Sequence, residues 1–481
     1  MAFTSEEESK IRAIIEAFQN GKTLNQLPIA NGKNPFDMFV EVLDTDGESK
    51  KAALATLLPY MEDECSYGVE FDTAVSSKDC TRIGNLALHK TLPVHETMKG
   101  VLLDDNGNEV EFLHPTSWLN QSRDGARGQV MTRLPEGYYR KFTTKGTKRT
   151  VRISQYPLPG YHFVPTKYIS AYQATMERST GKLASVVNTA VDFRGGNNNA
   201  AYDGTYRSFL GLPATAISRT GYRTAARKRN NSATSEWNCM TYDIQKDLYW
   251  LYVIEYATLD TQKPFNAQLT PEGYHQGGLG DGVTTWNWGD WSKFNGNYPF
   301  IPCGVTDKLG NGTGVVNYEL KGEDGLTLKE FSVPRYRGVE NPFGHLWQWA
   351  DGINVRISPD SPTGDGLSKV FVCTDPSKFN DSNYNGYRHV GNEARTEGYV
   401  KSVIFGEEGD IMPDVVGGST TTYHCDYHYT NIPKDTEALR GVLFGGFADV
   451  GASAGFACAH SNRAPSDTTA LIGSRLCFIP A

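Results

Sequence analysis

Residues 338–354, GVENPFGHLWQWADGIN, decide the fold together with a second run near the end of the sequence, residues 473–478, GSRLCF. Within the first run His345 stands among aromatic and apolar neighbours, and we interpret it as a hydrogen-bonded core histidine, with a catalytic base as the alternative. Residues 475–479 are predicted to form a buried strand. We expect this strand to pair near another one predicted at residues 168–172, YISAY, so that the end of the sequence is structural.

The composition predicts a β-rich α+β protein. With 481 residues the chain is long enough for roughly three domains, or for two if one is an elaborated β-rich fold. A hydrophobic content of 39% and a charged content of 21% are typical of a loop-rich globular protein with short strands. We expect an N-terminal amphipathic helix and linker over residues 1–35, a small antiparallel β domain over 36–158, and a large domain with long loops over 159–481.

The charge balance argues against nucleic acid as a partner. Lys and Arg number 47 and Asp and Glu number 55, a net charge of −8 that repels phosphate backbones. The densest basic cluster has the spacing of a helix face and is expected to form a salt-bridged helix: Arg219, Arg223, Arg227, Lys228 and Arg229. We find no apolar stretch long enough to insert into a membrane and no signal peptide, so we expect synthesis in a cytoplasm.

The N-terminal segment predicts an attachment or oligomerisation helix. Thr4 and Glu7 have capping-box spacing, and an apolar stripe follows on one helix face: Ile11, Ile14, Ile15 and Phe18. The stripe either packs on its own domain or meets copies of itself or a socket protein. Further along, residues 101–103 and 110–113 flank the turn signal DNGN and predict a hairpin, and residues 243–256 predict a buried helix.

One segment concentrates potential metal ligands. In an extended chain His424, Asp426 and His428 would share one side, and three such ligands could hold zinc or nickel. No distant fourth ligand is identifiable, so we expect a solvent-facing polar strand edge and predict no metal, while leaving the metal site open. The eight cysteines contain no CxxC pair, and we interpret most of them as reduced, buried small hydrophobes.

A tryptophan-rich segment is a candidate for ligand binding. An aromatic loop of the kind that stacks on sugars or anchors an interface is formed by Trp286, Trp288 and Trp291 with the intervening Asp290. The alternative is that the three tryptophans are buried and form the core of this loop. The metalloprotease motif HExxH does not occur.

Several runs together resemble a known fold. Residues 168–175 (YISAYQAT), 250–256 (WLYVIEY), 338–354 and 473–478 are similar to the C-type-lectin-like fold of the formylglycine-generating-enzyme type. That form is common in gut bacteriophage fibre proteins and in the variable proteins of diversity-generating retroelements. Residues 66–165 also resemble the β region that precedes such a domain in those phage proteins. The likeness covers most of the chain and is most specific in its C-terminal run.

The resemblance implies where a ligand would bind. In such variable proteins the contacting residues lie on a loop just before the closing GSRL motif, which places them here within residues 447–469. The implied contacts are Phe447, Ala448, Asp449, Val450, Ala452, His460, Ser461, Asn462, Arg463, Ser466, Asp467, Thr468 and Thr469. The segment is small, polar and turn-prone, as expected of an exposed recognition loop. Residues 447–471 also contain no Lys, Glu, Gln, Met or Trp, the residues that randomised AAY codons cannot encode.

Two departures from the resembled family bear on activity. Its enzymes hold copper with a pair of reactive cysteines, whereas Cys458 and Cys477 are far apart in sequence with no reason for a low thiol pKa. The family's Arg-Gly-Gly-Ser-Trp motif survives only as Gly445, Gly446 and Phe447. We therefore expect no enzymatic activity and no cofactor.

The resulting expectation is a bacteriophage virion fibre or receptor-binding protein. Its lectin-like domain would bind a host cell-surface glycan or protein, its N-terminal region would contact other virion proteins, and a homotrimer is expected by analogy. Two alternatives stay open: a structural head or tail decoration protein that packs on other virion proteins, and an enzyme on a formylglycine-generating-enzyme-like fold.

Overall fold

The computed structural model describes residues 61–230 and 236–480, together with the strands β1 (Phe39–Leu43) and β2 (Ser49–Ala53), which pair antiparallel. The helix predicted to carry Ile11, Ile14, Ile15 and Phe18 lies outside the described residues. Strands make up 36% of the chain and helices 14%, so the predicted β-rich α+β class is confirmed.

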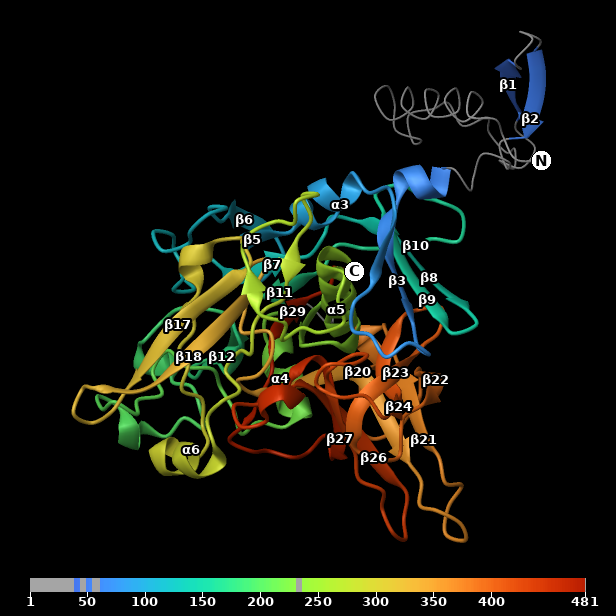
Figure 1. Ribbon diagram of the computed structural model, residues 1–481. Coiled ribbons are helices and arrows are strands. Elements are labelled where there is room, and N and C mark those ends of the chain that lie inside the picture. The colour runs from blue at the N-terminus through green and yellow to red at the C-terminus, as the bar shows by residue number, and fades with distance from the viewer. Residues whose placement is uncertain (1–38, 44–48, 54–60, 231–235, 481) are drawn as a thin grey trace.

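Three larger sheets form the body of the protein (Figure 1). The five-stranded sheet has the order β10 (His162–Val164), β8 (Tyr138–Lys145), β9 (Lys148–Ser154), β3 (Tyr67–Asp72), β4 (Thr81–Gly84). The six-stranded sheet has the order β14 (Trp237–Cys239), β29 (Leu476–Phe478), β11 (Tyr168–Ser170), β7 (Gln129–Arg133), β5 (Lys99–Leu103), β6 (Glu109–Phe112).

The nine-stranded sheet is built from the second half of the chain. Its order is β22 (Arg388–Asn392), β21 (Ser368–Val372), β20 (Trp347–Ile357), β26 (Ala438–Gly445), β27 (Gly455–Arg463), β25 (Tyr427–Tyr429), β23 (Gly398–Phe405), β24 (Asp410–Val416), with β28 (Ile472–Gly473) parallel to β20. Smaller sheets are β17 (Gly314–Lys321), β18 (Thr327–Tyr336), β19 (Val339–Glu340); β12 (Thr175–Glu177), β13 (Lys182–Ala184); and β15 (Phe265–Asn266), β16 (Gln276–Gly277).

Helices are few and short among the described residues. They include the α-helices α3 (Leu88–Thr91), α4 (Arg219–Arg227), α5 (Tyr242–Tyr256) and α6 (Trp288–Asn295). The 3-10 turns are η3 (His95–Thr97), η4 (Val191–Phe193), η5 (Ala200–Tyr202), η6 (Asp307–Leu309), η7 (Pro376–Lys378) and η8 (Gly451–Ser453).

The strand predicted at the end of the sequence is confirmed. β29 lies between β14 and β11, and its register places Tyr168 opposite Phe478 and Ile169 opposite Cys477. The hairpin predicted around the DNGN turn is also confirmed as β5 and β6. The same sheet contains strands from both sides of the boundary predicted at residues 158 and 159, so hydrogen bonds cross that boundary. The domain division itself stays a prediction.

Helix α5 lies at the centre of the molecule (Figure 1). The Thr241 hydroxyl caps its first turn by accepting from the Ile244 backbone N–H, and Ala257 ends it in a left-handed conformation. It packs against β3 and β9 on one side and β20 and β27 on the other, which explains why it is apolar on most of its surface. The buried helix predicted from the sequence is thus confirmed.

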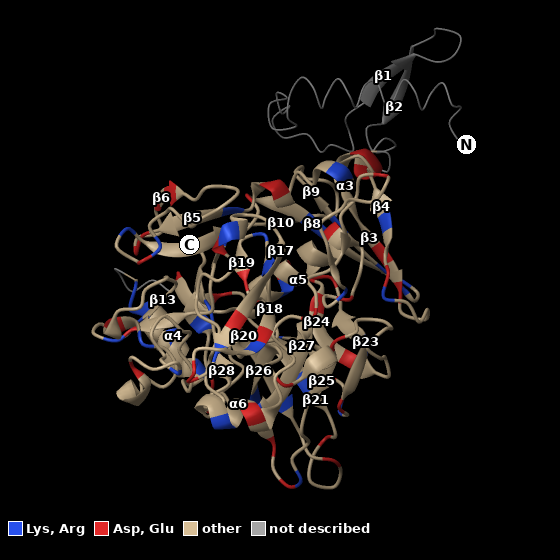
Figure 2. Ribbon diagram, turned by 60° about the vertical axis from the view of Figure 1, so that its left-hand side comes forward, with Lys and Arg blue, Asp and Glu red and all other residues tan. Residues whose placement is uncertain are grey.

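The basic cluster forms the salt-bridged helix that its spacing predicts. In α4, Arg223 donates to Asp351 at 2.9 Å and to Asp381 at 2.6 Å, and Arg219 also pairs with Asp381. Just beyond the helix, Arg229 pairs with Asp105 at 2.7 Å. Figure 2 shows Lys and Arg interspersed with Asp and Glu over the described ribbon. None of the helices in the described part of the chain is long and apolar enough to cross a membrane.

Candidate recognition pocket

A small pocket opens at one end of β27 and brings together four residues that the sequence singled out. Its volume is about 150 Å³, and the predicted members of its lining are Trp288, Phe447, His460 and Arg463. The rest of the lining is Trp347, Tyr429, Leu443, Leu471 and Ile472. The pocket therefore combines the tryptophan-rich segment with the segment before the closing GSRL motif.

Sheet register explains why these residues meet. In the nine-stranded sheet, β27 lies between β25 and β26, and His460 is opposite Tyr429 on one side and Leu443 on the other. Phe447 follows the end of β26, and Trp288 opens helix α6, whose first turn is capped by the Asn287 side chain. The pairings join segments that are far apart in the sequence.

Aromatic rings form the walls and floor of the pocket. The Trp288 ring meets Phe447 edge-on, with ring centroids 6.2 Å apart. Trp347 lies 6.1 Å from Phe447 and 5.1 Å from His460. Trp288 is 48% exposed, whereas Trp347 is only 3% exposed. The exposed Trp288 ring and the buried Trp347 ring thus both contact Phe447. An exposed ring beside buried ones suits stacking against the face of a sugar or a side chain.

Two polar groups complete the lining. His460 is 8% exposed, and its Nδ1 has no hydrogen-bond partner among the described residues. Burial lowers the pKa of His460 to about 3, so the imidazole is neutral at physiological pH and offers one donor and one acceptor. Arg463 is half-exposed, and its Nη1 lies 3.8 Å from Asp467, a loose ion pair that a ligand could exchange for its own contact.

The expectation of one continuous exposed loop over residues 447–469 is wrong. Residues 455–463 form β27 inside the sheet, and the predicted contacts Ala448, His460 and Ser461 are buried. The physical reason is the run Phe456, Ala457, Cys458 and Ala459, whose small and apolar side chains are covered on both faces of a central strand.

Other predicted contacts remain accessible. Asp449, Ala452, Ser466 and Thr468 are exposed. The half-buried ones are Phe447, Val450, Asn462, Arg463, Asp467 and Thr469. They lie before β27, after it, or, for Asn462 and Arg463, at its last two positions, so the candidate surface is two separate segments at the ends of a strand.

The three tryptophans divide between core and surface. Trp286 and Trp291 are 3% and 0% exposed and pack with Phe300 in a hydrophobic cluster, where the Trp286 and Phe300 centroids are 4.5 Å apart. The Trp291 indole N–H donates to the Tyr298 carbonyl at 2.8 Å. Trp286 and Trp291 are therefore buried core residues of the loop, and of the three tryptophans only Trp288 reaches the pocket surface.

The expected solvent-facing strand edge at His424, Asp426 and His428 is also wrong. All three side chains are buried. The His424 Nδ1 lies 2.7 Å from the Tyr249 hydroxyl, the His428 Nε2 lies 3.0 Å from the Ala394 carbonyl, and the Asp426 Oδ2 accepts from the Ala457 N–H at 2.7 Å. Each of the three side chains thus has at least one internal hydrogen-bond partner, which offsets part of the cost of burial, while the His428 Nδ1 has none among the described residues. Across the described ranges, no three His, Cys, Asp or Glu side chains are placed to share a metal ion.

His345 and the cysteines behave as the sequence predicts. His345 is fully buried, its Nδ1 is 2.8 Å from the Gln173 Oε1, and burial lowers its pKa to about 3. All eight cysteines are free, and all but Cys80 are buried. Burial raises the pKa of Cys458 well above its usual range and that of Cys477 to about 12.

Sequence reasoning missed five pocket residues: Trp347, Tyr429, Leu443, Leu471 and Ile472. Trp347 belongs to the run that decides the fold, and it was used only as a marker of that fold. Tyr429 follows the His424–His428 segment, whose alternating aromatic and polar side chains were the available signal. Leu471 and Ile472 carry no signal of their own, since any buried strand has such residues.

The fold and pocket define a β-rich α+β protein with a small pocket lined mainly by aromatic and apolar residues. No protein-family model and no curated protein matches the chain. Among solved structures, PvdO from Pseudomonas aeruginosa is 12% identical over 76% of this chain and 99% of its own, with a TM-score of 0.32. Treponema denticola variable protein 1 is 11% identical over 75% and 99%, with a TM-score of 0.27. The Major Tropism Determinant U1 variant is 12% identical over 71% and 72%, with a TM-score of 0.18. Likenesses this remote do not show a family.

Proposed function

We propose that the chain is a bacteriophage virion protein of the fibre or receptor-binding kind, whose lectin-like C-terminal part binds a ligand on the host surface. The observation that carries the proposal is the pocket in which the exposed Trp288 ring meets Phe447, while the buried Trp347 ring contacts both Phe447 and His460. The sequence resemblance supports the same interpretation, because the pocket includes the segment just before the closing GSRL run.

The size of the pocket limits what it can take. A volume of about 150 Å³ equals the liquid volume of about five water molecules, which is below the range of pockets for drug-sized ligands. It suits one sugar ring or one protein side chain, with the aromatic rings against its apolar face and Arg463 and His460 at its polar edge. A terminal residue of a host cell-surface glycan, or a side chain of a host protein, is the proposed ligand.

Binding rather than catalysis is proposed for this pocket. Its lining contains no carboxylate, serine or cysteine, so it offers no nucleophile paired with a base. Binding of a single sugar or a single host side chain in the pocket is weak. Several copies of the protein on one particle would raise the effective concentration for the second and later binding events. We therefore propose a homotrimer attached to the virion through its N-terminal region.

The double variant Trp288→Ala/Arg463→Ala tests the proposal. Trp288 is 48% exposed and the Arg463 side chain 42%, so we expect a change of no more than about 1 kcal/mol in the free energy of unfolding. Adsorption of particles or purified protein to host cells should fall at least tenfold, since a few aromatic and arginine contacts carry most of an interface energy.

The matched control is Phe163→Ala, which truncates an aromatic ring 58% exposed and outside the pocket. It should leave adsorption unchanged. Full adsorption by the double variant, with an unchanged melt, would reject the recognition role and favour a structural decoration protein.

A further inference from the structure

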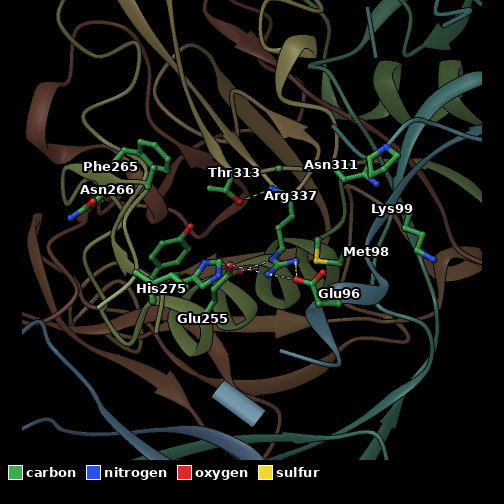
Figure 3. A pocket seen from close by; sticks show the side chains of 15 residues that line it. Glu96, Met98, Lys99, Glu255, Phe265, Asn266, His275, Asn311, Thr313 and Arg337 are labelled. Carbon is green, nitrogen blue, oxygen red and sulfur yellow. Dashed lines mark hydrogen bonds and ion pairs between the residues drawn. The ribbon is translucent and has the colours of Figure 1, made fainter. Parts of the chain in front are cut away.

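A second and larger cavity lies away from the recognition pocket, and it has the dimensions of a small-molecule site. Its volume is about 490 Å³, within the range of roughly 300–1,000 Å³ that is typical of ligand pockets. It lies beside the C-terminal end of α5, between β15 and the loop that precedes β17 (Figure 3). None of its lining residues is shared with the recognition pocket.

The floor of this cavity is a closed network of charges. The buried Glu255 carboxylate accepts from Arg337 Nε at 2.7 Å and from Arg337 Nη2 at 3.0 Å. Its Oε1 also lies 2.9 Å from His275 Nδ1, and its Oε2 accepts from the Tyr336 hydroxyl at 3.1 Å. Each carboxylate oxygen therefore already has two partners.

The hydrogen-bond donors of Arg337 are also fully used. Besides Glu255, its guanidinium donates to the His95 carbonyl at 3.1 Å and, from both Nη atoms, to Glu96 Oε1 at 3.2 Å. Guanidinium carries five N–H groups, and these contacts use all of them. An anionic ligand that replaced Glu255 would displace a buried carboxylate, which is costly because it leaves a buried charge unpaired; the Glu96 side chain, by contrast, is 64% exposed.

The charges of the lining also cancel. Its two carboxylates, Glu96 and Glu255, face two basic side chains, Arg337 and Lys99. Lys99 is exposed, and its Nζ lies 5.8 Å from the centre of the Phe112 ring, a residue outside the lining. The site therefore holds no uncommitted buried charge of either sign that could neutralise an ionic ligand.

The rim supplies neutral polar groups and an aromatic face. In Figure 3, Phe265 and Asn266 lie on one side of the cavity and Asn311 on the opposite side. The Asn311 Oδ1 accepts from the Gly100 N–H at 2.9 Å, which fixes the amide and leaves its Nδ2 donors for a ligand. The His275 ring, held through Nδ1, presents Nε2 as a further polar contact.

We propose that this cavity binds a neutral, hydroxyl-rich ligand, a mono- or disaccharide. Hydroxyl groups donate and accept, so they can match amide and imidazole groups at the rim without disturbing the ion pairs of the floor. Phe265 and Tyr256 offer ring surface for the apolar face of the sugar. This second site stands whether or not the recognition pocket proves to be the attachment site.

Titration calorimetry and saturation-transfer NMR of the full chain test the proposal. The probes are glucose and maltose, with glucuronate and glucosamine as charged counterparts of glucose. We expect glucose or maltose to bind at millimolar concentration or tighter, and both charged sugars to bind at least tenfold more weakly than glucose. Asn311→Asp keeps the contact with Gly100 but removes the Nδ2 donors, and Phe265→Ala removes the ring, so each should weaken binding about tenfold.

Phe163→Ala, which truncates an exposed ring outside both the cavity and the recognition pocket, is the control, and it should bind these sugars as the parent does. If Asn311→Asp lowers the melting temperature, the exposed Asn266→Ala replaces it as the rim variant. The proposal is overturned if neither neutral sugar binds at millimolar concentration, if glucuronate or glucosamine binds as tightly as glucose, or if the rim variants bind like the parent.

Discussion

Arg475 joins three segments of the chain through one buried side chain. Its Nε donates to the Gln348 side chain at 2.8 Å, its Nη1 to the Ser170 carbonyl at 3.1 Å, and its Nη2 to the Asn341 carbonyl at 2.8 Å. Burial lowers its pKa to about 10, which still leaves it charged at neutral pH. The closing GSRL run is therefore structural, because its buried arginine holds three segments of the chain together; we call this set of hydrogen bonds the Arg475 clamp.

Replacing this residue tests the clamp. Arg475→Met fills much of the volume but leaves several buried carbonyl groups without donors, so the free energy of unfolding should fall by about 3 kcal/mol or more. Guanidinium chloride unfolding measures the change. Arg127→Met, which removes an exposed arginine paired with Glu111, is the control and should cost no more than about 1 kcal/mol. Equal losses for the two variants would contradict the clamp.

Glu393 predicts a pH dependence of stability. Its Oε1 accepts from the Thr430 and Ser461 hydroxyls at 3.1 and 2.9 Å, while its Oε2 has no partner among the described residues, and burial raises its pKa to about 8. Between the ordinary pKa of 4.5 and about 8, the folded protein holds a proton that the unfolded chain has released. This group's contribution to stability is therefore lost as pH rises through that window.

The variant Glu393→Gln should remove this contribution. Its free energy of unfolding, relative to the parent, should rise by up to about 1.4 kcal/mol per pH unit between about pH 5 and about pH 8 and stay level above that. Denaturant unfolding at a series of pH values measures the difference between the two proteins. A difference that does not change with pH would show that Glu393 is ionised inside the fold.

At the scale of elements, β27 and β29 show what the sequence could and could not reveal. The run Leu476, Cys477 and Phe478 is continuously apolar, and it was recognised as a buried strand. Residues 455–463 contain Gly, Ala and Ser, which occur both in exposed turns and in strands whose neighbours approach closely. Composition alone does not separate these two settings, so the sequence predicts an exposed loop where the structure has the strand β27.

Removing β29 tests its structural role. This strand pairs with β14 on one side and β11 on the other, and truncation after Gly473 would leave both without their shared partner. Calorimetry should then show the loss of the cooperative unfolding transition. A truncated protein that melts like the parent would show that the six-stranded sheet does not depend on this strand.

At the scale of the whole molecule, the fold class was predictable and the recognition pocket only in part. Trp288, Phe447, His460 and Arg463 were all named from the sequence. Their meeting with Trp347 and Tyr429 depends on the pairing of β27 with β25 and β26, which no local pattern encodes. The second cavity was not predicted, because its network joins Glu96, Glu255 and Arg337, residues up to 241 positions apart in the sequence.

The predicted N-terminal helix bears on assembly. If the stripe of Ile11, Ile14, Ile15 and Phe18 is buried between copies or in a socket protein, its apolar surface would stabilise the assembly by a few kcal/mol per chain, at about 25 cal/mol per Å². Deleting residues 1–21 should then release monomers or stop incorporation into particles. Light scattering with and without these residues measures the mass, and an unchanged assembly would contradict an attachment role.

The place of β29 in the six-stranded sheet has a kinetic consequence. Ser170 and Arg475 are hydrogen-bonded across 305 positions of sequence, so the sheet closes only after a very long loop has been brought together. Contacts of such separation slow folding. Until β29 docks, β11 and β14 present unpaired edges, to which strands of other chains can add. Refolding yield should therefore fall as protein concentration rises, and chaperones that shield strand edges should restore it.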